Sequence, residues 1–246
     1  MPESTDDQKL LAAAHVDDAV FDLRPDYQAL LLIVEGIVPG ASDESSEALL
    51  SQAEASTAQR VTEGPIEELE HVAAWREAYR AFGAKPQRTR NSLEALTRRA
   101  ETGLPRVNRL TDIYNAISVL HQIPLGGEDL AGYVGAPHLV RASGEEPFEV
   151  TSDGEPSLEY PKPGEVIWRD DAGVTCRRWN WRQGPRTQLT AETTQALFIL
   201  DALAPVTIED LTMAADALVQ HLSDFSPNLR TSRRIISAET TGQTRL

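Results

Sequence analysis

The sequence has a single cysteine, Cys176, among its 246 residues. One cysteine excludes an intramolecular disulfide framework and a zinc site built from several cysteines, and it fits a reducing compartment. Long hydrophobic runs are also missing, because the longest, ALLLIV at 29–34, is far shorter than the roughly 20 apolar residues that span a bilayer. The start of the chain lacks the basic segment and apolar run of a secretory signal. We therefore expect a cytoplasmic protein.

Residues suited to metal or phosphate-loop chemistry are sparse. The five histidines are scattered, and no two of them have the i,i+4 spacing of a helical metal site. LGGEDL at 125–130 lacks the lysine and the Ser/Thr of a P-loop, so we predict a turn there. A lone cysteine on a predicted strand is more often a packed hydrophobe than a nucleophile. The sequence thus predicts no metal and no cofactor.

Basic charge is scarce overall but concentrated locally. The formal net charge is -15, yet residues 76–110 contain 9 basic residues against 3 acidic ones. A second segment, CRRWNWRQGPRT at 176–187, has four arginines, two tryptophans and no acidic residue. An acidic chain gains nothing from diffuse attraction to nucleic acid. Any polyanion it binds must therefore meet one of these two segments.

The succession of hydrophobic periods predicts an α+β fold. Helical spacing and capping residues predict helices at about 46–61, 65–82, 91–100, 107–121, 190–203 and 207–223. Short β-branched and aromatic segments, separated by Gly, Pro and Asp, predict antiparallel strands over 138–182. We predict a single domain over 19–225, with a central, mostly antiparallel sheet and flanking helices. The polar residues 1–18 and 226–246 are predicted to be a leader and a flexible tail.

The arginine-rich segment has two interpretations. If residues 174–181 are extended, alternation places Arg178 and Asn180 on one face and Trp179 and Trp181 on the other. Guanidinium groups can then hold a phosphate or carboxylate while an amide fixes a sugar or an amine. Alternatively, Arg178 and Arg182 pair with carboxylates inside the fold and the tryptophans belong to the core. Composition alone leaves both interpretations open.

The other basic segment interleaves arginines with aromatic residues. Such a mixture suits an RNA surface, where aromatic rings stack on bases and arginines hold phosphates. The aromatics at 75, 79 and 82 also have helical spacing, which is typical of a core. The candidate RNA-binding residues are Arg76, Arg80, Lys85, Arg88, Arg90, Arg98 and Arg99.

Several segments, in the same order, resemble free-standing relatives of the B3/4 domain, the editing module in the beta subunit of phenylalanyl-tRNA synthetase. They are WREAYRAFGAKPQRTRNSLEALTRRA, GLPRVNRLTDIYNAISVLHQIPLGGEDL, GEEPFEV, PGEVIWRDDAGVTCRRWNWRQGPRTQLT and ETTQALFILD. The resemblance is strong over about 65–200. The synthetase module hydrolyses the ester of tyrosine wrongly attached to the tRNA for phenylalanine. The resemblance implies a cytoplasmic domain whose pocket accepts an aminoacyl group on the 3′ end of a tRNA.

The resemblance also implies substrate-binding residues. Asn115 lies in DIYNAIS, which is similar to the synthetase's asparagine-containing pocket helix. Gly184 matches a glycine of the segment that recognises the tyrosine hydroxyl, but Pro185 stands where that segment has its glutamate. Proline cannot accept a hydrogen bond from a phenol. We therefore expect altered selectivity or lost activity, or a carboxylate supplied by Glu145 from another strand.

An aminoacyl ester is already activated, so hydrolysis needs a positioned water and relief of charge on the oxyanion, without a metal. We expect Asn115, Asn180 and Thr187 to line the pocket and orient water or the amino group. Arg178 and Arg182 are expected to anchor the terminal phosphate or adenosine. The predicted function is hydrolysis of a mischarged aminoacyl-tRNA in trans, with tRNA as the partner. The alternatives are a non-catalytic module that binds tRNA or amino acid, and a domain whose arginines are internal braces.

Overall fold

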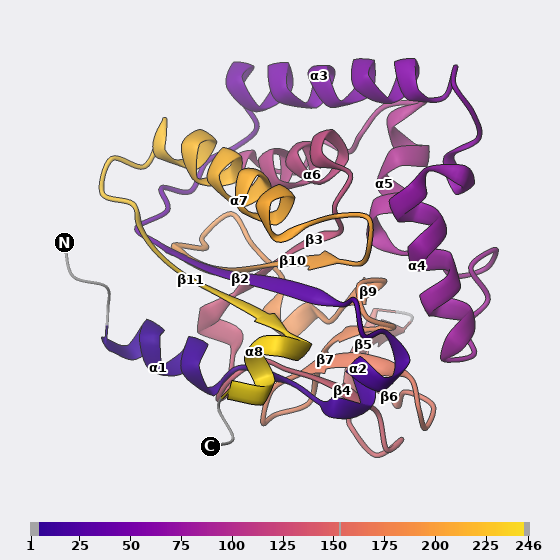
Figure 1. Cartoon of the computed structure of the whole chain (residues 1–246). Helices are drawn as coiled ribbons and strands as arrows, with labels where there is room; N and C mark the ends of the chain where they lie inside the picture. Colours follow the sequence, from indigo (N-terminus) through magenta and orange to yellow (C-terminus); the bar gives the residue numbers. More distant parts are fainter. Residues whose placement is uncertain (1–4, 153, 244–246) are drawn as a thin grey trace.

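The computed structural model describes residues 5–152 and 154–243. Within these residues the chain forms three sheets with helices packed around them, which confirms the α+β prediction (Figure 1). The central sheet is antiparallel throughout and has the strand order β11-β2-β10-β3. Its strands are β2 (Gln28–Glu35), β3 (Leu125–Asp129), β10 (Gln195–Ala202) and β11 (Arg230–Ser237).

A second sheet lies below the first in Figure 1 and has the order β1-β4-β7-β8-β9. Its strands are β1 (His15–Val16), β4 (His138–Arg141), β7 (Val166–Arg169), β8 (Val174–Arg177) and β9 (Arg182–Gln183). Only β1 is parallel to its neighbour among these described strands; the other pairs are antiparallel. The remaining sheet is a hairpin of β5 (Phe148–Ser152) and β6 (Glu155–Glu159).

Helices cover the outer face of the central sheet and one end of the molecule (Figure 1). Those over the sheet are α3 (Glu44–Arg60), α6 (Arg109–His121) and α7 (Ile208–Ser223), and those at the end are α4 (Glu70–Ala81) and α5 (Ser92–Ala100). The shorter helices are α1 (Thr5–Ala13), α2 (Asp18–Leu23) and α8 (Ala238–Gln243), and the 3-10 turns are η1 (Ile66–Glu68), η2 (Leu130–Gly132) and η3 (Pro185–Thr187). None of the described helices combines the length and apolarity that crossing a bilayer requires.

The central sheet separates two hydrophobic cores. Leu30 and Leu32 of β2 pack under α3, α6 and α7, whereas Leu31 and Ile33 face the second sheet. Because successive strand residues point to opposite faces, a strand buried on both sides is apolar without alternation. This explains why β2 is the longest apolar run of the sequence.

Two predicted helix starts are confirmed by their hydrogen bonds. The Asn91 side chain accepts from the Glu94 backbone N–H at 2.9 Å, at the start of α5. Thr207 and Asp210 form a reciprocal capping box at the start of α7. Both signals are local in sequence, and the helices form where they predict.

Two secondary-structure predictions for the sheet region are wrong. The helix expected at 190–203 is largely strand β10, and the turn expected at LGGEDL is strand β3. β10 lies between β2 and β3 and is buried on both faces, so its residues lack the alternation of a half-buried strand. The glycines of β3 permit close packing, since a β carbon on Gly127 would lie 2.6 Å from Leu189.

The prediction of a disordered leader and tail also fails over the residues described. Residues 5–13 form α1, and β11 of the predicted tail pairs with β2 along its whole length. As the edge of the central sheet, β11 needs apolar residues mainly where it meets the core, at Ile235 and Ile236. Backbone pairing rather than apolar content therefore orders it. Residues 1–4 of the predicted leader and residues 244–246 of the predicted tail lie outside the residues that the structure describes.

Candidate functional site

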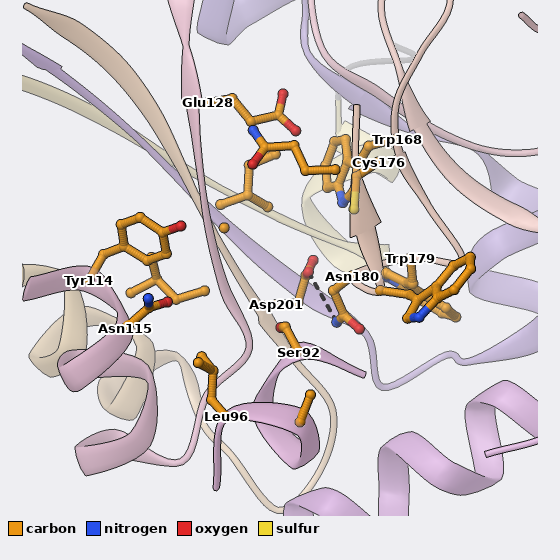
Figure 2. A pocket seen from close by; sticks show the side chains of 16 residues that line it. Ser92, Leu96, Tyr114, Asn115, Glu128, Trp168, Cys176, Trp179, Asn180 and Asp201 are labelled. Atoms are coloured by element: carbon orange, nitrogen blue, oxygen red, sulfur yellow. Dashed lines mark hydrogen bonds between the residues drawn. The ribbon is translucent and has the colours of Figure 1, made fainter. Parts of the chain in front are cut away.

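A cavity of about 260 Å³, called here the central cavity, is enclosed by α5, α6 and strands of the two larger sheets (Figure 2). Its apolar wall includes Leu96 of α5 and Ile199 of β10 together with the indoles of Trp168, Trp179 and Trp181. Its polar groups come from different elements and are Asn115, Glu128, Asn180, Gln183 and Asp201. A concave apolar site with a few convergent polar groups is typical of a small-molecule pocket.

One turn positions the aromatic and amide groups of this cavity. Arg178 and Trp179 follow β8 and adopt φ angles of 48° and 68°, in the left-handed region that costs non-glycine residues about 1–3 kcal/mol. The turn buries Trp179 completely against Trp75 and Tyr27, at ring distances of 5.2 and 5.0 Å. It then directs Asn180 into the cavity.

The predicted strand over 174–181 is therefore wrong beyond Arg177. The left-handed residues interrupt the alternation, so Arg178 and Asn180 do not share a strand face. The turn is closed by the Trp181 N–H, which donates to the Arg177 carbonyl at 3.1 Å, and is tied to α5 by the Ser92 N–H, which donates to the Asn180 carbonyl at 2.9 Å.

Asn180 is part of a buried hydrogen-bond chain. The Tyr79 hydroxyl donates to its Oδ1 at 2.9 Å, and its Nδ2 donates to Asp201 Oδ2 at 3.3 Å. The Tyr27 hydroxyl donates to the other oxygen of Asp201 at 2.5 Å. These contacts fix the amide orientation, and they leave one of the two Asn180 amide hydrogens available to a ligand.

Two carboxyl groups in the cavity are held away from water. Burial raises the pKa of Asp201 to about 7, although the Tyr27 hydroxyl and the Asn180 amide favour its charged form. Burial also raises the pKa of Glu128 to about 7, against the opposing effect of the Tyr133 hydroxyl that donates to it. Each carboxyl therefore exists in both protonation states near neutral pH.

Replacing Asp201 with asparagine should change how stability depends on pH. Because the pKa of Asp201 is about 7 in the folded protein against an ordinary 3.8, protonation favours the folded state. The contribution of Asp201 is complete below pH 4, is lost as pH rises to about 7, and is constant above. The free energy of unfolding of wild type minus that of Asp201→Asn should fall over this interval, as measured by urea denaturation.

The matched control is Asp216→Asn, which changes an aspartate with a 63% exposed side chain on α7. Its difference from wild type should not fall over the same interval. If the difference in free energy of unfolding between wild type and Asp201→Asn does not change with pH, the pKa of Asp201 is not raised in the folded protein.

Asn115 and Cys176 contribute differently to the cavity. Asn115 projects from α6 and is 7% exposed, and no group in the described chain hydrogen-bonds to its side chain. Its amide is therefore available to a ligand. Burial raises the pKa of the Cys176 thiol well above its usual value, so the thiol is protonated and is a poor nucleophile.

The described residues contain no group of three or more His, Cys, Asp and Glu side chains arranged to hold a metal ion. His71 illustrates the structural use of histidine here. Its Nε2 accepts from the Trp75 indole and the Leu203 backbone N–H, both at 3.1 Å. Burial lowers the pKa of His71 to about 4, so it is a neutral core residue.

Residues 74–220 match the family model of the B3/4 domain, and this segment is more than half of the chain. The chain belongs to the B3/4 domain family. The matched segment contains every residue that encloses the central cavity. No curated protein matches the chain significantly.

One similar solved structure is an N-terminal fragment of the phenylalanyl-tRNA synthetase beta-subunit from Pyrococcus horikoshii. The identity is 14% and the TM-score 0.45, and the match covers 92% of this chain and 52% of that one. This chain thus spans about half the length of that fragment.

The central cavity includes two of the three residues predicted to be catalytic. Asn115 and Asn180 both line it, from α6 and from the turn after β8. Thr187 is fully buried in η3 and lies outside the lining. Its backbone carbonyl accepts from the side chain of the cavity residue Gln183 at 3.0 Å, so Thr187 lies behind the cavity wall rather than in it.

The predicted substrate-binding residues are dispersed rather than gathered in the cavity. Glu145 is exposed in the loop before β5 and lies in another surface hollow, beside Asp171. Gly184 is buried beside Phe148, and Arg182 is exposed on β9, 3.8 Å from Glu159. Arg178 lines a different hollow from the cavity. Pro185 is also outside the cavity lining and belongs to another surface hollow.

Two arginines of the 176–187 segment are internal braces. Arg177 holds Glu165 through two hydrogen bonds of 2.8 and 2.9 Å, and Arg186 holds the fully buried Asp170 through two of 2.7 Å. Such bidentate pairs fix geometry inside the fold. The brace interpretation named Arg178 and Arg182, whereas the bidentate braces are these two other arginines of the segment: Arg178 lies 3.6 Å from Glu165, and Arg182 is exposed.

The predicted RNA-binding arginines divide in the same way. Arg76 and Arg98 donate to the buried Glu94 at 2.8 and 3.1 Å, and Arg90 lies 3.5 Å from it. The charges of Arg76 and Arg98 are thus balanced by Glu94 inside the fold, whereas the Arg90 side chain is 45% exposed. The exposed members of the set are Arg80, Lys85, Arg88, Arg90 and Arg99.

Glu128, Asp201 and Trp181 line the cavity although they are not among the residues predicted to do so. Asp201 ends the apolar run ALFIL, where an isolated carboxylate predicts a buried polar site once the run is taken as a strand. Glu128 was assigned to a turn, so its burial had no signal. Both Trp179 and Trp181 line the cavity; Trp179 is fully buried in the core as expected, whereas Trp181 is only partly buried against it.

Proposed function

We propose that this B3/4 protein hydrolyses the ester bond of a mischarged aminoacyl-tRNA in trans. The observation that supports the proposal best is the central cavity, which has room for an aminoacyl group between aromatic walls and two asparagine amides. Membership of the family whose synthetase member edits tRNA also supports it. The partner would be the acceptor end of a tRNA carrying its amino acid.

The proposed reaction needs one water molecule. A bond forms between the water oxygen and the ester carbonyl carbon as the bond to the ribose oxygen breaks, and the proton from water reaches that ribose oxygen through the vicinal hydroxyl. The remaining Asn180 N–H donates to the carbonyl oxygen as negative charge develops on it. Asn115 orients the water, since its amide is not committed elsewhere. The products are the free amino acid and a tRNA with a free terminal hydroxyl.

The cavity carboxyls supply selectivity in this proposal. An aminoacyl group presents an ammonium and, for some amino acids, a hydroxyl, and both need acceptors inside an aromatic pocket. Asp201 and Glu128 provide such acceptors from β10 and β3. A site built around buried acceptors discriminates strongly against analogues that leave them unpaired.

Asn115→Ala should reduce deacylation by about 100-fold, because the attacking water loses its orientation. The measurement is release of amino acid from a panel of correctly and incorrectly paired aminoacyl-tRNAs at catalytic amounts of protein. The variant should fold normally, since the Asn115 amide has no partner to leave unsatisfied.

Asn228→Ala is the matched control, because Asn228 is exposed in the turn before β11. It should hydrolyse the same mischarged species as wild type. Wild-type protein that hydrolyses no member of the panel but still binds tRNA or amino acid would identify a non-catalytic binding module instead.

A further inference from the structure

A second concave site is lined by Arg178, which directly precedes the cavity residue Trp179 in the turn after β8. It has a volume of about 430 Å³ and is lined by the loop after α4, the loop before β7 and Arg178. We call it the basic recess and define it by its four cations, Lys85, Arg88, Lys162 and Arg178.

Positive charge in this recess is largely uncompensated. Lys85, Arg88 and Lys162 form no ion pair with any residue that the structure describes. The one acidic residue in the lining, Glu165, holds Arg177 with both carboxylate oxygens and also lies 3.6 Å from the Arg178 guanidinium, so the three uncompensated cations are Lys85, Arg88 and Lys162. Because the whole chain carries a charge of -15, this local excess of cations is unusual for it. This local positive charge favours the binding of a polyanion at the recess over binding elsewhere on the surface.

Arg178 is held in place before any ligand arrives. Its guanidinium lies 4.2 Å from the ring centroid of Trp181 and donates a hydrogen bond to the Thr89 hydroxyl. Its side chain is only 25% exposed, and its backbone has the left-handed φ described above. Such an arginine loses little conformational freedom when it binds a phosphate.

The recess and the cavity share this turn. Arg178 lines the recess, while Trp179, Asn180 and Trp181 line the cavity. The two sites are therefore next to each other along the chain, as recognition of a ligand with a phosphate near its reactive ester requires. Phe82 adds a partly exposed aromatic ring to the recess wall, against which a base or ribose can pack.

We propose that the basic recess binds a backbone phosphate of the RNA whose aminoacyl end enters the central cavity. This inference rests on the proposed function for the identity of the RNA. It assigns Lys162, which lies outside both basic segments of the sequence, to RNA binding. It keeps Arg178 as a phosphate ligand and places that phosphate in the recess rather than in the central cavity.

The test is the affinity of the full chain for an uncharged tRNA across a salt series. Lys162→Gln and Arg88→Gln should each weaken binding by about five- to tenfold at low salt and reduce the slope of log K against log salt by about 0.7. Lys9→Gln and Arg233→Gln are the matched controls, since both change exposed cations on distant elements, α1 and β11. The controls should bind tRNA as wild type does.

Two further arms separate the possible outcomes. Inorganic phosphate and adenosine monophosphate, tested alone, should bind far more weakly than tRNA; equal or tighter recess-dependent binding of either would overturn the RNA assignment. If deacylation occurs but the recess variants bind tRNA like the controls, the recess proposal fails while the hydrolase proposal stands. If recess-dependent tRNA binding occurs without deacylation, only the hydrolase proposal fails. Circular dichroism of each variant checks its folding.

Discussion

Glu94→Ala is expected to lower the free energy of unfolding by about 3–5 kcal/mol. Glu94 is completely buried on α5 and accepts from Arg76 at 2.8 Å and Arg98 at 3.1 Å. Arg76 is itself only 12% exposed. Removing the carboxylate therefore leaves a nearly buried guanidinium without its counter-charge, which is the costly way to break an ion pair. Urea denaturation measures the effect.

Glu67→Ala is the matched control, because Glu67 pairs with the same Arg98 but is 43% exposed. Its loss should cost less than about 1 kcal/mol. The double variant Glu94→Ala with Arg76→Ala should lose less than the sum of the two single losses, since the second substitution removes the stranded charge. A loss below 1 kcal/mol for Glu94→Ala would show that these arginines return to water easily and do not brace the fold.

The parts of the fold that the sequence predicts are those with local causes. The helices after Asn91 and Thr207 begin at capping residues whose hydrogen bonds reach only three residues along the chain. The second sheet is predictable because its short strands are separated by turn residues, such as the DAG turn at 171–173. In each case the sequence neighbourhood contains the physical reason for the structure.

The central sheet is harder to predict because each of its strands is stabilised by pairing with a strand that is distant in the sequence. β10 contains Ala, Leu and Phe without alternation, and only burial between β2 and β3 makes it a strand. β11 is ordered by pairing with a strand about 200 residues earlier. Neither partner is visible in a local window, so a helix and a flexible tail are the natural but incorrect predictions.

The residues of the candidate site also divide into those that the sequence indicates and those that it does not. The family resemblance located Asn115, and the composition of the 176–187 segment located Asn180, and both lie in the cavity. The pocket carboxylates were missed because Asp201 belongs to the misassigned strand. Arginine roles were also not predictable, since the neighbours Arg177 and Arg178 differ: Arg177 holds Glu165 with two hydrogen bonds, whereas Arg178 lies 3.6 Å from Glu165 and lines the basic recess. The left-handed turn that separates them has no glycine to signal it.

Gly126→Leu is expected to reduce deacylation by about 100-fold or more while leaving the fold intact. Gly126 lines the central cavity from β3, and a β carbon built there meets no heavy atom within 4 Å. The added side chain therefore grows into the space that the aminoacyl group would occupy. Displacing a reacting group by about 1 Å is enough for a loss of this size. The measurement is deacylation of the mischarged species that wild type hydrolyses, with thermal unfolding followed in parallel.

Gly64→Leu provides the control, because Gly64 lies in the loop after α3 and also has no heavy atom within 4 Å of an added β carbon. Both variants add the same apolar side chain to an open position, so they differ only in whether the cavity is filled. The melting temperatures should stay close to that of wild type in both. If Gly126→Leu hydrolyses the substrate as fast as Gly64→Leu does, the ester binds elsewhere and the central cavity is not the active site.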